Sequence, residues 1–168
     1  PSLRHQFIFE FLFDSVRAHL RRSGTPGRAV SPPFPVRLWT GQFREPDIVY
    51  LRPERITNVD RQPTADDLVM EIVSADAREL DFAKKRQEYA RAGIPEYWIV
   101  DPETRTVTVL TLDGVEPGGP YRVHGEFKPG ETATSLLLPG LAVSVDDVFA
   151  AGEGGTAPAE GATPSGRA

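Results

Sequence analysis

Residues 67–102 read DLVMEIVSADARELDFAKKRQEYARAGIPEYWIVDP, and this stretch decides the fold. Its first part, Asp67–Val73, is almost entirely apolar, as expected of a strand that is covered on both faces. The charged segment Asp76–Ala92 has the pattern of an amphipathic helix, which Gly93 can end. Glu96–Val100 then forms a second apolar strand. The order of strand, helix and strand predicts a β-α-β unit of an α/β fold.

The flanking sequence extends this unit into one domain. Apolar residues recur at helical spacing over Ser2–Arg22 and predict a helix that packs on the core. Clusters of β-branched and aromatic residues between turn signals predict further strands. These strands are Ala29–Ser31, Val36–Trp39, Asp47–Leu51, Arg105–Leu112, Tyr121–Phe127 and Leu141–Val145.

We therefore predict a single domain over residues 1–149, as the chain length allows. Residues 150–168 are mostly Gly, Ala, Pro, Glu, Thr and Ser, and we interpret them as a disordered tail. The chain begins at Pro1 without an initiator methionine, so we expect the N-terminal part of the domain to be truncated.

Composition limits the chemistry that this domain can perform. The chain has no cysteine and three histidines, which excludes thiol catalysis and argues against a cysteine- or histidine-rich metal cluster. It has no apolar run long enough to span a membrane, and we expect a soluble, cytoplasmic protein. The net charge of −5 is the wrong sign for a protein that binds nucleic acid through its overall charge. Contact with DNA would need a local basic surface, for which Lys84 and Arg86 are candidates.

Three residues are candidates for a catalytic site. Glu71 interrupts an apolar strand, and a buried carboxylate there must be paired, protonated or bound to a metal ion. Asp47 begins a strand directly after Pro46, where it could equally be a turn residue. Lys85 falls near the apolar face of the helix, and its alternative interpretation is an ion pair with Asp81. For Glu71, the alternative is a structural pair with Arg or Lys.

The chain resembles the Uma-two family of endonucleases, which belongs to the PD-(D/E)XK restriction-endonuclease-like superfamily. The resemblance covers about Ser2 to Phe149, and its motifs are specific because several unusual elements occur in fixed order. The residues that carry it are Pro46-Asp47-Ile48-Val49, Glu71-Ile72-Val73-Ser74, Asp81 with Lys85 and Tyr89, and the run Gly93 to Pro102.

The resemblance implies a mixed central sheet flanked by helices and a site for Mg²⁺ or Mn²⁺. Asp47, Glu71 and the carbonyl of Ile72 would be the ligands, and Asp47, Glu71 and Lys85 the catalytic residues. The superfamily pattern has a lysine where this chain has Val73, and Lys85 on the helix is its counterpart. We also expect Asp81 and Tyr89, one helical turn on either side of Lys85, to support it.

The sequence therefore predicts a metal-dependent endonuclease that hydrolyses phosphodiester bonds of DNA. One alternative is a catalytically inactive binding or scaffold protein with the nuclease fold, acting as a homodimer, and the acidic charge favours it. Another alternative is a small-molecule enzyme that uses the same carboxylates.

Overall fold

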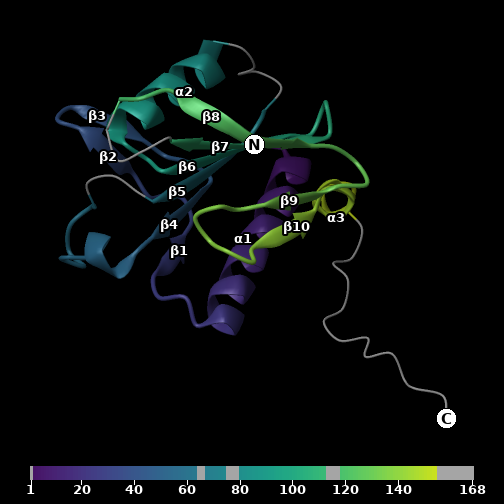
Figure 1. Cartoon of the computed structure of the whole chain (residues 1–168), viewed down its shortest axis with the longest axis horizontal. Helices are drawn as coiled ribbons and strands as arrows, with labels where there is room; N and C mark the ends of the chain where they lie inside the picture. Colours follow the sequence, from purple (N-terminus) through teal and green to yellow (C-terminus); the bar gives the residue numbers. More distant parts are fainter. Residues whose placement is uncertain (1, 64–66, 75–79, 113–117, 155–168) are drawn as a thin grey trace.

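The computed structural model describes residues 2–63, 67–74, 80–112 and 118–154, without the side chains of Leu80 and Asp81 (Figure 1). Within these ranges the helices are α1 (Leu3–Ser23), the short 3-10 helix η1 (Pro53–Arg55), α2 (Leu80–Ala92) and α3 (Val145–Ala151). The strands are β1 (Arg28–Val30), β2 (Val36–Trp39), β3 (Gln42–Arg44), β4 (Ile48–Leu51), β5 (Leu68–Ile72), β6 (Glu96–Asp101), β7 (Thr106–Leu112), β8 (Tyr121–Phe127), β9 (Thr132–Thr134) and β10 (Ala142–Ser144).

Six of these strands form the central sheet, in the order β1-β4-β5-β6-β7-β8. The pair β5 and β6 is parallel and is joined through α2, as the β-α-β prediction requires. The other neighbours in the sheet are antiparallel, so the sheet is mixed. The predicted fold class, an α/β protein with a mixed central sheet flanked by helices, is confirmed.

Each face of the central sheet carries its own hydrophobic core. In Figure 1, α1, α3 and the β9–β10 hairpin lie on one side of the sheet, and their apolar residues form a single buried cluster with those of β4, β5 and β6. On the other side, α2 and the β2–β3 hairpin cover a second cluster that contains Tyr89, Ile94 and Tyr97. The strands β4 and β5 contribute to both clusters, which explains why their sequences are almost continuously apolar.

Helix α1 follows the prediction for Ser2–Arg22 to within one residue. The Ser2 hydroxyl accepts a hydrogen bond from the backbone N–H of His5 and caps the first turn. At the other end, Gly24 adopts a left-handed conformation (φ 65°) that glycine permits without strain. The residues Ile8, Leu12, Val16 and Leu20 are buried, so the apolar stripe faces the sheet as its spacing predicts.

Several elements differ from the sequence prediction. Strands β3 and β9 and helix α3 were not predicted, because short elements carry little periodicity. Of the helix predicted over Asp76–Ala92, the structure describes Leu80–Ala92, and residues 75–79 lie outside the described part. The division into a domain over 1–149 and a tail over 150–168 stays a prediction, since residues 155–168 also lie outside it. None of the helices in the described ranges has the length and apolarity that crossing a membrane requires.

Glu96 is a buried carboxylate that serves as a structural anchor. It is 1% exposed and begins β6. Its Oε1 accepts hydrogen bonds from Trp98 Nε1 (2.7 Å) and the Ser135 hydroxyl (2.6 Å), and its Oε2 accepts from the backbone N–H groups of Leu136 (2.9 Å) and Leu137 (2.8 Å). Four donors thus replace the water that this carboxylate loses on burial. Glu96 ties the segment after β9 to the central sheet.

His19 makes the stability of the domain depend on pH. It is 6% exposed on α1, and burial, with a smaller contribution from the positive charge of Arg22, lowers its pKa. As the pH falls below the usual histidine pKa of about 6.5, the unfolded chain therefore binds more protons than the folded protein. We expect the free energy of unfolding to decrease between about pH 7.5 and pH 5.5, and to decrease less in a His19→Leu variant. Urea unfolding at both pH values measures this, and equal decreases in the two proteins would contradict it.

Candidate active site

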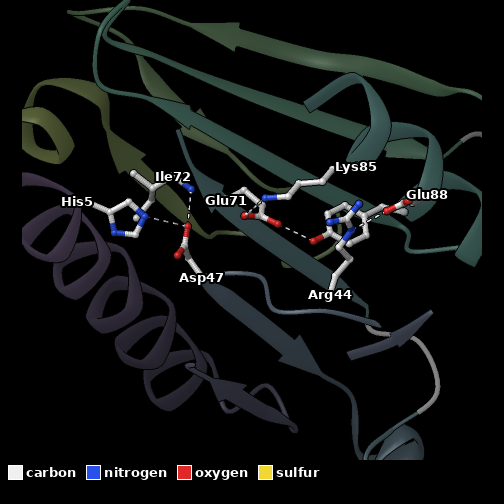
Figure 2. Close-up of polar contacts among 8 residues, drawn as sticks. His5, Arg44, Asp47, Glu71, Ile72, Lys85 and Glu88 are labelled. Carbon is white, nitrogen blue, oxygen red and sulfur yellow. Dashed lines mark hydrogen bonds and ion pairs between the residues drawn. The ribbon is translucent and has the colours of Figure 1, made fainter. Parts of the chain in front are cut away.

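Asp47 directly precedes β4, and Glu71 lies in β5, the neighbouring strand of the central sheet. Antiparallel pairing of β4 with β5 matches Ile48 with Met70, and continuing that register by one residue places Asp47 opposite Glu71. The Asp47 carboxylate lies close enough for its negative charge to act on Glu71, while its own partners come from α1 and from the backbone of β5. Figure 2 shows the two carboxylates between helix α1 and the Lys85 side chain of α2.

Glu71 is held by two groups from helix α2. Its side chain accepts a hydrogen bond from the Tyr89 hydroxyl on Oε1 (2.6 Å) and one from the Lys85 ammonium on Oε2 (3.0 Å). Glu71 is 4% exposed, and this burial raises its pKa. The Lys85 charge and the Tyr89 hydroxyl act in the opposite direction, while the negative charge of Asp47 raises the pKa further. The two acids thus repel each other, and the Lys85 ammonium partly offsets this repulsion.

Lys85 and Tyr89 are one helical turn apart on the inner side of α2. The Lys85 side chain is 17% exposed, and its ammonium lies 5.6 Å from the centre of the Phe82 ring. Tyr89 is fully buried, and burial together with the charge of Glu71 raises its pKa well above the usual value. The Tyr89 hydroxyl therefore stays protonated and donates to Glu71. Tyr89 was expected to support Lys85, and its contact with Glu71 places it beside Lys85 at the site. Asp81 was expected to do the same, but its side chain lies outside the described residues.

Asp47 is held by groups from the other side of the site. Its Oδ2 accepts a hydrogen bond from the backbone N–H of Ile72 (2.7 Å), the residue named as a carbonyl ligand, and lies 3.3 Å from Nε2 of His5 (Figure 2). The sequence analysis did not select His5 as a site residue, and this contact was missed. The spacing of His5 to Ile8 and Leu12 was the available signal, since residues at i, i+3 and i+7 share one face of a helix.

The two proposed DNA contacts lie outside this cluster of acids. Lys84 is exposed and its ammonium is 3.9 Å from Glu88, which also pairs with Arg44 (2.6 Å). Arg86 is exposed and donates to the backbone carbonyl of Tyr121 (3.4 Å). Both residues sit on α2 next to Lys85 in sequence, and the structure brings neither of them onto Asp47 or Glu71.

The donors at this site suit a hard divalent cation. Within the described ranges, no group of three or more His, Asp or Glu side chains is arranged as a metal site. Two adjacent carboxylates, one of which has a raised pKa, are nevertheless the oxygen ligands that Mg²⁺ or Mn²⁺ prefers, and a backbone carbonyl could complete such a set. A cation would also relieve the repulsion between the two acids.

The family model for Uma2, whose description is "Putative restriction endonuclease", matches residues 1–146. This chain belongs to the Uma2 family. A crystal structure from Anabaena variabilis, described as "a putative nuclease belonging to DUF820", aligns with this Uma2 chain with a TM-score of 0.71. The alignment covers 90% of this chain and 83% of the other at 19% identity, so it supports the fold alone. Among curated proteins, none matches the chain.

Membership of the Uma2 family confirms the family that the motifs around Asp47, Glu71 and Lys85 indicated. It places the chain among nucleases of the restriction-endonuclease type, because that is how the family is described.

Proposed function

We propose that this Uma2 protein is a metal-dependent endonuclease that hydrolyses phosphodiester bonds of DNA, with Asp47, Glu71 and Lys85 as its catalytic residues. The contact of the Lys85 ammonium with Glu71, beside Asp47, carries the proposal. An acid pair with an adjacent lysine is the arrangement that the PD-(D/E)XK pattern requires. The pattern has its lysine two residues after the glutamate, where this chain has Val73. Here the lysine is Lys85 and comes from α2.

Asp47 and Glu71, together with the carbonyl of Ile72, would hold Mg²⁺ or Mn²⁺. When bound, such an ion supplies Lewis acidity toward a phosphate oxygen and lowers the pKa of water. The remaining chemistry belongs to the side chains of the protein. Lys85 stays within hydrogen-bond distance of Glu71, so its ammonium is held where it can orient a water molecule and neutralise the charge that develops on the phosphate. Tyr89 keeps Glu71 in place through the other carboxylate oxygen.

Binding of DNA must overcome the net charge of −5, so a local basic surface is needed. Lys84 and Arg86 are the proposed phosphate contacts, because both are exposed on the helix that carries Lys85. Glu88 pairs with Lys84 and Arg44, which reduces the positive charge of this surface. We therefore expect weak binding that falls steeply as the salt concentration rises.

Cleavage of supercoiled plasmid tests the proposal. We expect the protein to nick the plasmid with Mg²⁺ or Mn²⁺ and to lose this activity when EDTA removes the ion. The double variant Asp47→Asn/Glu71→Gln keeps the shape of both side chains but removes both charges, and it should not cleave. Circular dichroism of the variant shows whether it is folded. Equal cleavage by the parent and the double variant would disprove the assignment, and a folded parent without any cleavage would favour the inactive scaffold.

A further inference from the structure

His5 connects helix α1 to the candidate active site through Asp47. Its Nε2 lies 3.3 Å from Oδ2 of Asp47, the same oxygen that accepts the hydrogen bond from the Ile72 N–H. Figure 2 shows His5 and the Ile72 N–H approaching Asp47 from α1 and from β5. One oxygen of the carboxylate therefore has two protein partners, which come from elements that are far apart in the sequence.

The second oxygen of Asp47 is in a different situation. Among the described residues, no donor makes a hydrogen bond to Oδ1, and the side chain of Asp47 is 18% exposed. Oδ1 is therefore the oxygen that Asp47 can offer to a cation. Which oxygen is offered depends on the rotation of the carboxylate, and the two contacts on Oδ2, one from the Ile72 N–H and one from His5, fix that rotation.

The burial of the His5 ring agrees with this arrangement. Nδ1 of His5 is buried and has no hydrogen-bond partner among the described residues. Nε2 is therefore the ring nitrogen that faces Asp47, at 3.3 Å from Oδ2. Because Nδ1 is buried, His5 is not placed to take a proton from a water molecule at the site. Its polar contact at the site is therefore the one with Asp47.

The backbone around His5 is well anchored. The N–H of His5 donates to the Ser2 hydroxyl at the start of α1. Ile8, one turn later, is buried, and a Cβ added at Gly152 after α3 would lie within 2.9 Å of its side chain. Close packing of this kind fixes the position of the first turns of α1. The backbone that carries the imidazole is therefore anchored on both sides of His5.

We propose that His5 is a positioning residue, which orients Asp47 so that Oδ1 faces the bound cation. This inference rests on the proposed metal site, and it adds a residue of α1 to the two acids and Lys85. It concerns affinity for the ion, so it can be measured without cleavage of DNA. Loss of a side chain that orients a ligand typically lowers metal affinity by about 10- to 100-fold.

Calorimetric titration of the full chain with Mn²⁺ tests this role. We expect His5→Leu to bind Mn²⁺ at least about 10-fold more weakly than the parent. His5→Gln should restore most of the affinity, because its amide nitrogen can reach the position of Nε2, whereas the shorter amide of His5→Asn should not. Gln6→Leu is the matched control, since Gln6 is the next residue of α1 and is exposed.

The outcomes separate this inference from the proposed function. If the parent binds Mn²⁺ and His5→Leu binds it equally well, the positioning role is wrong and the metal site stands. If the folded parent does not bind Mn²⁺, both are wrong. Urea unfolding shows whether each variant is folded. Should His5→Leu fail to fold, the comparison of His5→Gln with His5→Asn decides, and equal affinities of these two variants would overturn the inference.

Discussion

Replacing Lys85 with methionine should lower the rate of metal-dependent DNA cleavage by about 100-fold or more, the usual effect of removing a group that stabilises charge in the transition state. Methionine fills a similar volume and keeps the contact with the Phe82 ring, so the main loss is the charge near Glu71. The rate of plasmid nicking at saturating Mn²⁺ measures the effect. Saturation matters because loss of the lysine charge also changes how strongly the two acids attract the ion.

Lys84→Met is the matched control for this prediction. Lys84 is the neighbouring lysine on the same helix, but it is exposed and lies near Glu88 instead of Glu71. As a proposed phosphate contact, it should change the dependence of DNA binding on salt while leaving the rate at saturating DNA nearly unchanged. If both variants lose activity equally, Lys85 acts through the general charge of α2, and its catalytic role is wrong.

Replacing Glu96 with alanine should lower the free energy of unfolding by about 3 to 5 kcal/mol, which is a large part of the stability of an ordinary domain. The variant leaves the Trp98 indole N–H, the Ser135 hydroxyl and two backbone N–H groups without the acceptor they share. It also opens a cavity at the start of β6. Urea unfolding measures the change, and a variant that is already unfolded in buffer would agree with the upper end of the range.

Two further variants define the cause of this loss. Glu126→Ala removes an exposed glutamate of β8, which lies 3.6 Å from Lys128, and should have little effect on stability. Glu96→Gln keeps the size of the side chain but turns one acceptor into a donor, so it should also be clearly destabilising. A Glu96→Gln variant as stable as the parent would mean that packing, and not the hydrogen bonds, makes Glu96 important.

The sequence predicted the elements with strong patterns. The long stripe of α1 and the apolar strands β5 and β6 appear close to their predicted bounds, because each buries a periodic or continuous set of large side chains. Elements of three residues, such as β3 and β9, could not be predicted, since their stability comes from neighbours that are distant in the chain.

In the candidate site too, some residues could be predicted from the sequence and others could not. Glu71 and Lys85 could be selected from the sequence, because a charge in an apolar strand and a lysine on the inner side of a helix are both unusual. The structure brings these two residues into contact and places Asp47 beside them, while their catalytic roles stay predictions. The spacing of His5 placed it on the sheet-facing side of α1, but its contact with Asp47 could not be predicted, because that contact depends on how α1 docks against the sheet. The anchoring role of Glu96 could not be predicted either, since three of its four donors lie 39 to 41 residues away in the chain.

The polar groups that contact Asp47 and Glu71 come from α1, β5 and α2, with one or two contributed by each. None of these elements alone supplies all of the groups that hold the two acids. Partial opening of any one of these elements would therefore switch the enzyme off, even while the rest of the domain stayed intact. Enzymatic turnover would then report the integrity of the whole architecture, and inactivation by heat or urea should precede or accompany the loss of helical signal and never lag behind it.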